Sequence, residues 1–353
     1  MNFNSDIYIE DLHSAFHSVV NVNALVGKTV LVTGATGMIG SFVVDVLMYG
    51  NKASNLCCRV LAMGRNEEKA KKRFANHWQN DMFGFIMHDI NEPLPSHIPA
   101  ADYVIHAAST THPVAYATEP IETITTNVWG TRHLLDYICR FAPQARFVLM
   151  SSVEVYGQNR GDVEKFDEQY CGYIDSNTLR AGYPESKRLS EALCQAYHAQ
   201  NNINYVVARL PRTYGPTMLM SDTKALSQFI RKGIAKEDIV LKSKGEQLFS
   251  YAYVADAASA LLSIMLAGLD GQAYNISSPD SDIKLKDLAQ IVASISGTSL
   301  KFELPDATES AGYSTATIAV MDASRLQALG WSPNYSIRLG LRRTLECLAS
   351  DVK

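Results

Sequence analysis

The sequence predicts an α/β fold, in which a doubly wound parallel sheet is joined by a smaller C-terminal α/β domain. Short apolar runs typical of buried parallel strands recur along the chain, and helical patterns separate them. A glycine-rich turn follows the first of these runs, Thr29–Val32, and leads into an apolar helix. In sheets of this kind, ligands are expected at the carboxyl ends of the strands.

The composition is that of an ordinary globular protein, with 353 residues, of which 47% are hydrophobic and 19% charged. The net charge of −4 and the lack of a basic stripe argue against nucleic acid or an anionic membrane as a partner. Six cysteines are scattered without metal-ligand spacing, so we expect reduced thiols, no metal site and a cytoplasmic location.

The chain is expected to divide into three parts. Residues 1–26 contain no Lys or Arg, do not resemble a signal peptide and predict an N-terminal helical extension against the outside of the next domain. Residues 27–215, with a returning segment near 249–276, predict a nucleotide-binding domain. Residues 216–248 and 277–353 predict a substrate-binding domain, which includes a helix over 285–295 capped by Ser281 and Asp282.

The glycine-rich turn carries three glycines with separate physical roles. Gly34 permits the sharp turn from strand to helix, Gly37 lets backbone amides approach a pyrophosphate, and Gly40 lets the helix pack close to the strand. Strand, loop and helix arrive in the required order. We therefore predict a dinucleotide site formed by Gly34, Thr36, Gly37, Met38, Ile39 and Gly40.

The second predicted strand, Arg59–Met63, ends at Gly64, Arg65 and Asn66. A carboxylate at this point would bind both ribose hydroxyls of NAD and repel a 2′-phosphate, but the sequence has none here. Arg65 offers a planar fork that can pair with the phosphate instead. We therefore predict NADP in preference to NAD, with a solvent-facing Arg65 as the alternative.

The third and fourth predicted strands continue the cofactor site. The strand over 85–90 places Asp89 at an adenine edge, and the strand over 103–109 ends in small side chains that allow a flat cofactor to lie close. A helix from Glu119 to Phe141 follows, and Arg146–Met150 predicts the fifth strand.

The predicted chemical centre begins where the fifth strand runs into Ser152. Tyr183 and Lys187 open a helix some 30 residues later and are four residues apart, so they share one helix face. An ammonium beside a phenol lowers the pKa of that phenol, which makes Tyr183 a usable general base or acid, while Ser152 can bind the same substrate oxygen. A Tyr–Lys pair on an exposed helix face is the alternative interpretation.

With these motifs in this order, the sequence resembles the extended short-chain dehydrogenases/reductases of the nucleotide-sugar epimerase/dehydratase group. The resemblance runs from Gly27 to about Leu348. It is carried by the segments 33–40, 106–109, 151–157, 183–187, 214–216 and 253–256, together with Asn127 and Arg209.

The resemblance implies a Rossmann fold, a tightly held nicotinamide cofactor, a nucleotide-sugar substrate and a homodimer. The catalytic residues that it implies are Ser152, Glu154, Tyr183 and Lys187. The implied cofactor-binding residues add Gly64, Arg65, Asn66, Asp89, Ile90, Ala107, Ala108, Ser109, Asn127 and Arg209 to the glycine turn, Tyr183 and Lys187. The implied substrate-binding residues are Thr110, Val153, Glu154, Arg212, Thr217, Met218 and Phe249.

Three positions depart from the family pattern. Val153 stands where the 4,6-dehydratases have an Asp, which argues against a simple dehydratase. Phe249 replaces the family's usual arginine, a diphosphate and decarboxylation contact, and Arg212 replaces a common Asn. Losing one arginine from a diphosphate site costs roughly 1.5–3 kcal/mol if nothing replaces it, and our hypothesis is that Arg212 does so.

Four functions follow from this pattern. The first is a redox-neutral epimerase or dehydratase that passes through a keto sugar, and the second is a reductase that consumes NADPH to convert a nucleotide-linked keto sugar into an alcohol. Segment 215–222 looks like that of UDP-glucuronate decarboxylases, although Phe249 weakens this third alternative. The fourth is a non-catalytic NADP-binding protein, and the retained Tyr–Lys pair argues against it.

Overall fold

The computed structural model describes residues 5–111, 116, 118–303 and 317–349. Its centre is a seven-stranded sheet in the order β10-β6-β5-β4-β1-β2-β3, and every pair of neighbours in it is parallel. The strands are β1 (Thr29–Thr33), β2 (Arg59–Gly64), β3 (Phe83–Met87), β4 (Tyr103–His106), β5 (Arg146–Ser152), β6 (Asn204–Leu210) and β10 (Gln272–Asn275). The predicted doubly wound parallel sheet is confirmed.

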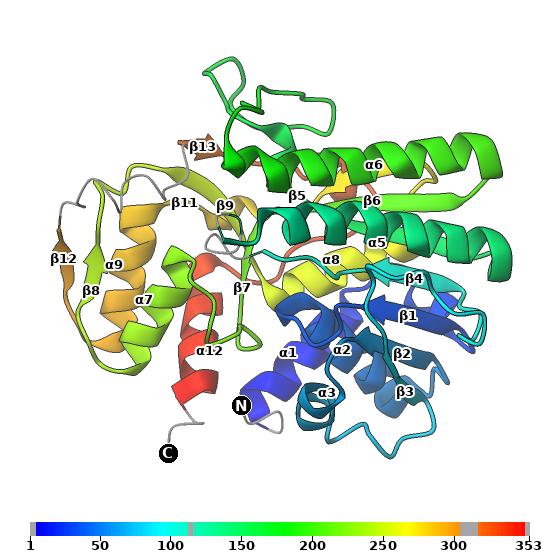
Figure 1. The fold of residues 1–353 in the computed structure, drawn as a ribbon. Coiled ribbons are helices and arrows are strands. Elements are labelled where there is room, and N and C mark those ends of the chain that lie inside the picture. Colours follow the sequence, from blue (N-terminus) through cyan, green and yellow to red (C-terminus); the bar gives the residue numbers. More distant parts are fainter. Residues whose placement is uncertain (1–4, 112–115, 117, 304–316, 350–353) are drawn as a thin grey trace.

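Helices cover both faces of this sheet (Figure 1). On β1, Val30 and Val32 pack on the side of α2 (Met38–Ser54) and α8 (Val254–Ala267), whereas Leu31 packs on the side of α5 (Pro120–Phe141). This alternation follows from the two-residue period of a strand, and burial on both faces explains why the strand is apolar throughout. Helix α6 (Gly182–Asn201) packs beside α5, and α3 (Glu67–Arg73) contacts β3.

The N-terminal helix α1 (Asp6–His17) packs against α2, α8 and α12 (Ile337–Ala349). Tyr8 donates a hydrogen bond to Asp45 of α2, and that carboxylate also contacts Arg73 at 2.5 Å and His77 at 2.9 Å. The predicted helical extension is therefore present, and it joins elements from both ends of the chain.

The remaining elements form a smaller group toward the C-terminus (Figure 1). Strand β9 (Leu248–Tyr253) pairs with β7 (Arg212–Tyr214), β11 (Asp282–Lys284) and β13 (Ile318–Ala319), and β8 (Ile239–Leu241) pairs with β12 (Leu300–Phe302). Helices α7 (Ala225–Ile234), α9 (Leu285–Ser296) and α12 pack on one another, and α11 (Ser324–Gln327) contacts β10. The division into domains at the predicted boundaries stays a prediction.

Three local predictions were wrong. The fourth strand, β4, ends at His106 rather than at Ser109. The third strand is β3, Phe83–Met87, so Asp89 and Ile90 lie beyond its end rather than within it. Helix α9 is capped by Lys284 without a side-chain hydrogen bond, whereas Ser281 lies in a short 3-10 helix, η4 (Pro279–Ser281), and Asp282 begins β11. Pairing of Asp282 with Ser250 of β9 extends the small sheet up to the helix and displaces the expected cap.

Candidate active site

The glycine turn between β1 and α2 forms a close-packed cradle. Gly34 has φ +61°, and a Cβ atom there would lie 2.6 Å from the backbone of Ala108 after β4. A Cβ atom at Gly40 would lie 2.7 Å from the Gly34 carbonyl oxygen. Gly37 caps α2 without any side-chain hydrogen bond, so the first amides of the helix stay available to an anion. These features fit the pyrophosphate of a dinucleotide.

The residues predicted for the adenosine end follow β2 and β3. Arg65 has 72% of its side chain exposed and lies 3.9 Å from the Asp89 carboxylate. Asn66 caps α3 by accepting from the amide of Lys69 at 2.8 Å, and Asp89 accepts from the amide of Asn91 at 3.0 Å. Among the described residues predicted for the adenosine end, Arg65 thus presents an exposed guanidinium.

The small residues after β4 meet the long helix α5. Ser109 donates to Asn127 Oδ1 at 2.8 Å, and Asn127 Nδ2 donates to Ser186 of α6 at 2.8 Å. Asn127 is buried. Two hydrogen bonds therefore connect the segment after β4 with helices α5 and α6, next to Tyr183.

Ser152, Tyr183 and Lys187 gather where β5 ends. Lys187 Nζ lies 5.9 Å from the centre of the Tyr183 ring and donates to the Met150 carbonyl oxygen at 2.9 Å. Burial raises the pKa of Tyr183 to about 12, although hydrogen bonds with Ser152 and Ser109 act to lower it. The predicted net acidity of Tyr183 is therefore wrong, because burial has a larger effect on its pKa than the groups that lower it.

Glu154 does not stand free in this site. It lies in the 3-10 helix η2 (Val153–Tyr156), and both its carboxylate oxygens accept from Arg180 Nη2 at 2.9 Å. The Arg180 guanidinium lies 4.8 Å from the centre of the Tyr116 ring, which stacks at 4.8 Å on the ring of Tyr183. Arg180, Tyr116 and Tyr183 thus form a continuous stack beside the carboxylate.

Sequence reasoning missed Arg180 and Tyr116. Arg180 stands three residues before Tyr183, in the turn η3 (Leu179–Ala181) that leads into α6, and this helical spacing was an available signal. No signal pointed to Tyr116, because no local spacing relates it to Tyr183.

The predicted substrate residues come from several segments, among them β7 and β9 of the smaller sheet. The Arg212 guanidinium of β7 lies 3.4 Å from the centre of the Phe249 ring of β9. Thr217 donates to the Met38 carbonyl oxygen of the glycine turn at 2.9 Å, which brings this segment to the cofactor cradle. Met218 and Val153 are buried, whereas Thr110 is half-buried just after β4.

Two guanidinium nitrogens in this region lack a hydrogen-bond partner within the described part of the chain. They are Nη1 of Arg180 and Nη1 of Arg212, and both are buried. A buried donor without a partner costs free energy comparable to a lost hydrogen bond. Both arginines therefore have a donor left for an anionic or carbonyl group.

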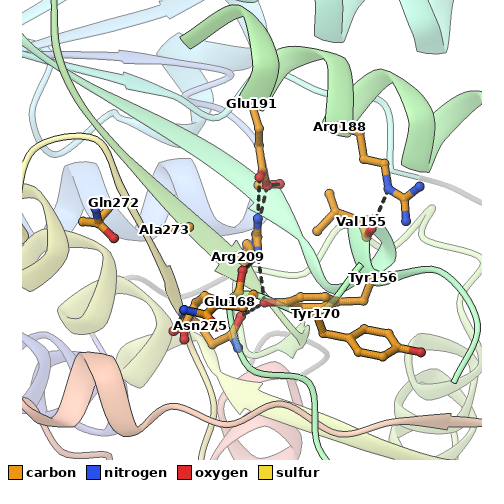
Figure 2. Close-up of polar contacts among 12 residues, drawn as sticks. Val155, Tyr156, Glu168, Tyr170, Arg188, Glu191, Arg209, Gln272, Ala273 and Asn275 are labelled. Carbon is orange, nitrogen blue, oxygen red and sulfur yellow. Dashed lines mark hydrogen bonds and ion pairs between the residues drawn. The ribbon is translucent and has the colours of Figure 1, made fainter. Parts of the chain in front are cut away.

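Arg209 lies in a different setting from the one expected of a cofactor contact. Its Nε and Nη2 donate to Glu191 at 3.1 and 2.6 Å, and its Nη1 donates to the Tyr156 hydroxyl and the Glu168 carbonyl oxygen, both at 2.9 Å (Figure 2). The guanidinium is thus bound to protein acceptors on several sides. Its contact with a cofactor stays a prediction.

Some kinds of site find no support among the described residues. No group of three His, Cys, Asp or Glu side chains is arranged there to hold a metal ion. Over the same residues, no helix combines the length and the apolar character that crossing a membrane requires.

Comparisons with known proteins agree with this geometry. The family model of the NAD dependent epimerase/dehydratase family matches residues 30–277. UDP-glucuronic acid decarboxylase 2 of Arabidopsis thaliana is 31% identical over 89% of this chain and 67% of its own length. UDP-glucuronic acid decarboxylase 1 of Danio rerio is 31% identical over 92% of this chain and 74% of its own length.

The fold is also found in solved structures. A dTDP-glucose 4,6-dehydratase of Streptomyces venezuelae with NAD bound superposes with a TM-score of 0.78 over 92% of this chain and 97% of that chain, at 22% identity. At this identity the likeness concerns the fold.

Proposed function

The chain belongs to the NAD dependent epimerase/dehydratase family, and on this premise we propose that it is an NAD(P)-dependent enzyme that acts on a nucleotide-activated sugar through a keto-sugar intermediate. The observation that carries the proposal is the meeting of Ser152, Tyr183 and Lys187 at the end of β5, beside the Gly34 cradle. Function is assigned here from the site rather than from the fold.

A bound nicotinamide cofactor would supply the hydride acceptor and donor for a sugar carbon. The residues that would hold it are the glycine turn, the segments after β2, β3 and β4, Asn127 and Lys187. Tyr183 takes the proton of the sugar hydroxyl as the hydride leaves, so that the alcohol becomes a ketone, and gives the proton back when the ketone is reduced. Ser152 donates a hydrogen bond to the same oxygen, and the ammonium of Lys187 favours the phenolate.

The experiment that tests this function offers UDP- and dTDP-activated sugars to the purified protein with NAD or NADP and follows sugar products by NMR and the reduced cofactor by absorbance. A changed sugar without net cofactor consumption is the expected result, and Tyr183→Phe should abolish it. In a parallel assay supplied with NADPH and a nucleotide-linked keto sugar, stoichiometric NADPH consumption would favour the reductase instead. No conversion of any substrate, with wild type and Tyr183→Phe alike, would refute the proposal.

We propose NADP as the preferred cofactor, because Arg65 carries the one exposed charged fork predicted for the ribose position. Its ion pair with Asp89 is long and exposed, so it costs little to break. Dissociation constants for NADP and NAD, measured by calorimetry, test the preference. Tenfold tighter binding of NAD would contradict it.

Decarboxylation of a nucleotide-linked uronic acid is the second candidate, and the decarboxylase names of the curated relatives favour it. Phe249 lacks the charge that this reaction would use. We propose that Arg212, stacked on Phe249 with a free buried nitrogen, binds the diphosphate instead. Arg212→Ala should raise the Michaelis constant for the nucleotide sugar, and an unchanged constant would exclude this assignment.

We further propose a homodimer and a cytoplasmic location. Helices α5 and α6 pack side by side and expose several apolar side chains, among them Ile121, Trp129 and Leu189. Such a patch is typical of a protein–protein interface. The cysteines are free thiols, which fits a reducing compartment. Light scattering and cell fractionation test the two statements.

A further inference from the structure

The catalytic face of α6 extends one turn beyond Lys187. Tyr183, Lys187 and Glu191 follow one another at intervals of four residues, so they line one side of the helix. Glu191 has 16% of its side chain exposed. The mechanism proposed above gives this carboxylate no part.

Side chains of two neighbouring strands, β5 and β6, donate hydrogen bonds to the Glu191 carboxylate. Ser151 of β5 donates to Oε1 at 2.5 Å. Arg209 of β6 donates to Oε1 through Nε at 3.1 Å and to Oε2 through Nη2 at 2.6 Å (Figure 2). Ser151 and Arg209 are opposite each other in the β5–β6 register. Three donors therefore fix the carboxylate in one position.

Arg209 is fixed in turn by a further set of acceptors. Its Nη1 donates to the Tyr156 hydroxyl and to the Glu168 carbonyl oxygen, and the Tyr156 hydroxyl donates to Asn275 Oδ1 at 2.6 Å (Figure 2). Replacing a buried ion pair by apolar groups is often neutral for stability. The position of the Glu191 carboxylate, rather than its stability contribution, is the informative feature.

The Lys187 side chain lies one helical turn before Glu191 on the same face of α6. Lys187 is 2% exposed, and its ammonium donates to the Met150 carbonyl oxygen at 2.9 Å. Burial lowers the pKa of Lys187 to about 8, and the charge of Glu191 acts in the opposite direction. Without that charge, the ammonium would lose its proton at a lower pH.

Among the described residues, the other groups named here beside Lys187 offer no second anion at neutral pH. Tyr183 lies on the same helix with a pKa raised to about 12 by burial, and His106 of β4 has a pKa lowered to about 3 by burial, so both are neutral. Helix α5 contributes the amide of Asn127, and β5 contributes a carbonyl and the Ser151 hydroxyl. Strand β6 contributes the cation of Arg209, which opposes the effect of Glu191.

We propose that Glu191, held by Ser151 and Arg209, is a positioning residue whose carboxylate keeps the Lys187 ammonium charged beside Tyr183. The proposal rests on the catalytic assignment of Tyr183 and Lys187 made above. Arg209 limits the effect by balancing part of the negative charge. The two partners should therefore move the protonation of Lys187 in opposite directions.

The test uses the full-length protein labelled with ¹³C at the ζ carbon of tyrosine, and Tyr183→Phe assigns the signal. Deprotonation of Lys187 gives an inflection in the pH titration of the Tyr183 signal. Glu191→Gln should move this inflection about one unit lower and Arg209→Gln should move it higher. Glu185→Gln removes an exposed carboxylate from the same helix and should leave it in place.

Shifts of opposite sign support the proposal, because a purely structural role would not separate the two variants by sign. Equal shifts, shifts of the same sign or no shift would overturn it. If Glu191→Gln does not fold, Glu191→Asp serves instead, because its side chain is one methylene group shorter and holds the carboxylate farther from Lys187. The inflection should then move to lower pH by less than the unit expected for Glu191→Gln. The titration needs neither substrate nor cofactor, so its failure would leave the nucleotide-sugar assignment untouched.

Discussion

The Gly34 cradle makes the most direct prediction about how the fold serves the site. Gly34→Ala adds one methyl group at a residue with φ +61°, where the new Cβ atom would lie 2.6 Å from the Ala108 backbone. The left-handed conformation costs a non-glycine residue about 1–2 kcal/mol. Overpacking against backbone adds about 1–3 kcal/mol.

The matched control is Gly27→Ala, since Gly27 has φ +68° and nothing within 4 Å of its added Cβ atom. It carries the conformational cost alone. Urea unfolding should therefore show a loss of about 1–2 kcal/mol for Gly27→Ala and a larger loss for Gly34→Ala. Calorimetry should show at least about tenfold weaker cofactor binding, near 1.4 kcal/mol, for Gly34→Ala only. Equal stability and equal affinity of the two variants would refute the close approach of β1 and β4.

Three further predictions concern charge and association. Burial raises the pKa of Asp256 from 3.8 to about 7, so the folded chain binds more protons than the unfolded chain between these pH values. The free energy of unfolding should therefore fall by up to about 4 kcal/mol as the pH rises from 4 to 7. In urea titrations, Asp256→Asn should make this pH dependence smaller. Asp11 has no exposed surface and accepts from Arg343 at 2.7 Å. In urea unfolding, Asp11→Ala should lower the free energy of unfolding by about 3 kcal/mol. Glu10 is an exposed partner of the same arginine, so Glu10→Ala should lower it by less than about 1 kcal/mol. Trp129→Glu should convert the proposed dimer into a monomer in light scattering, and an unchanged mass would remove the α5–α6 face as the interface.

The main sheet could be predicted because its strands are buried on both faces. Val30, Leu31 and Val32 are apolar without interruption, and the glycine turn after them marks where the strand ends. The strand predicted over 85–90 starts two residues and ends three residues too late, because the half-buried edge position of β3 gives a weaker apolar pattern. The cap of α9 failed for another reason, since sheet pairing of Asp282 competes with capping.

The candidate site could be predicted only as far as local spacing reaches. Tyr183 and Lys187 share a helix face by their spacing alone. The partners of Arg180 and Arg209, by contrast, come from segments far apart in the sequence. The expected acidity of Tyr183 failed on the same ground, because burial depends on the whole fold and outweighs one neighbouring charge.

The position of the catalytic ammonium illustrates how strand register enters the chemistry. The Lys187 ammonium donates a hydrogen bond to the Met150 carbonyl oxygen of β5. The side chain of the next residue, Ser151, donates to Glu191. Ser151 faces Arg209 only in the observed register with β6. A slip of one residue would turn either side chain to the other face of the sheet and leave Glu191 without its donors. The charge beside Tyr183 therefore depends on the pairing of β5 with β6 as much as on the spacing along α6.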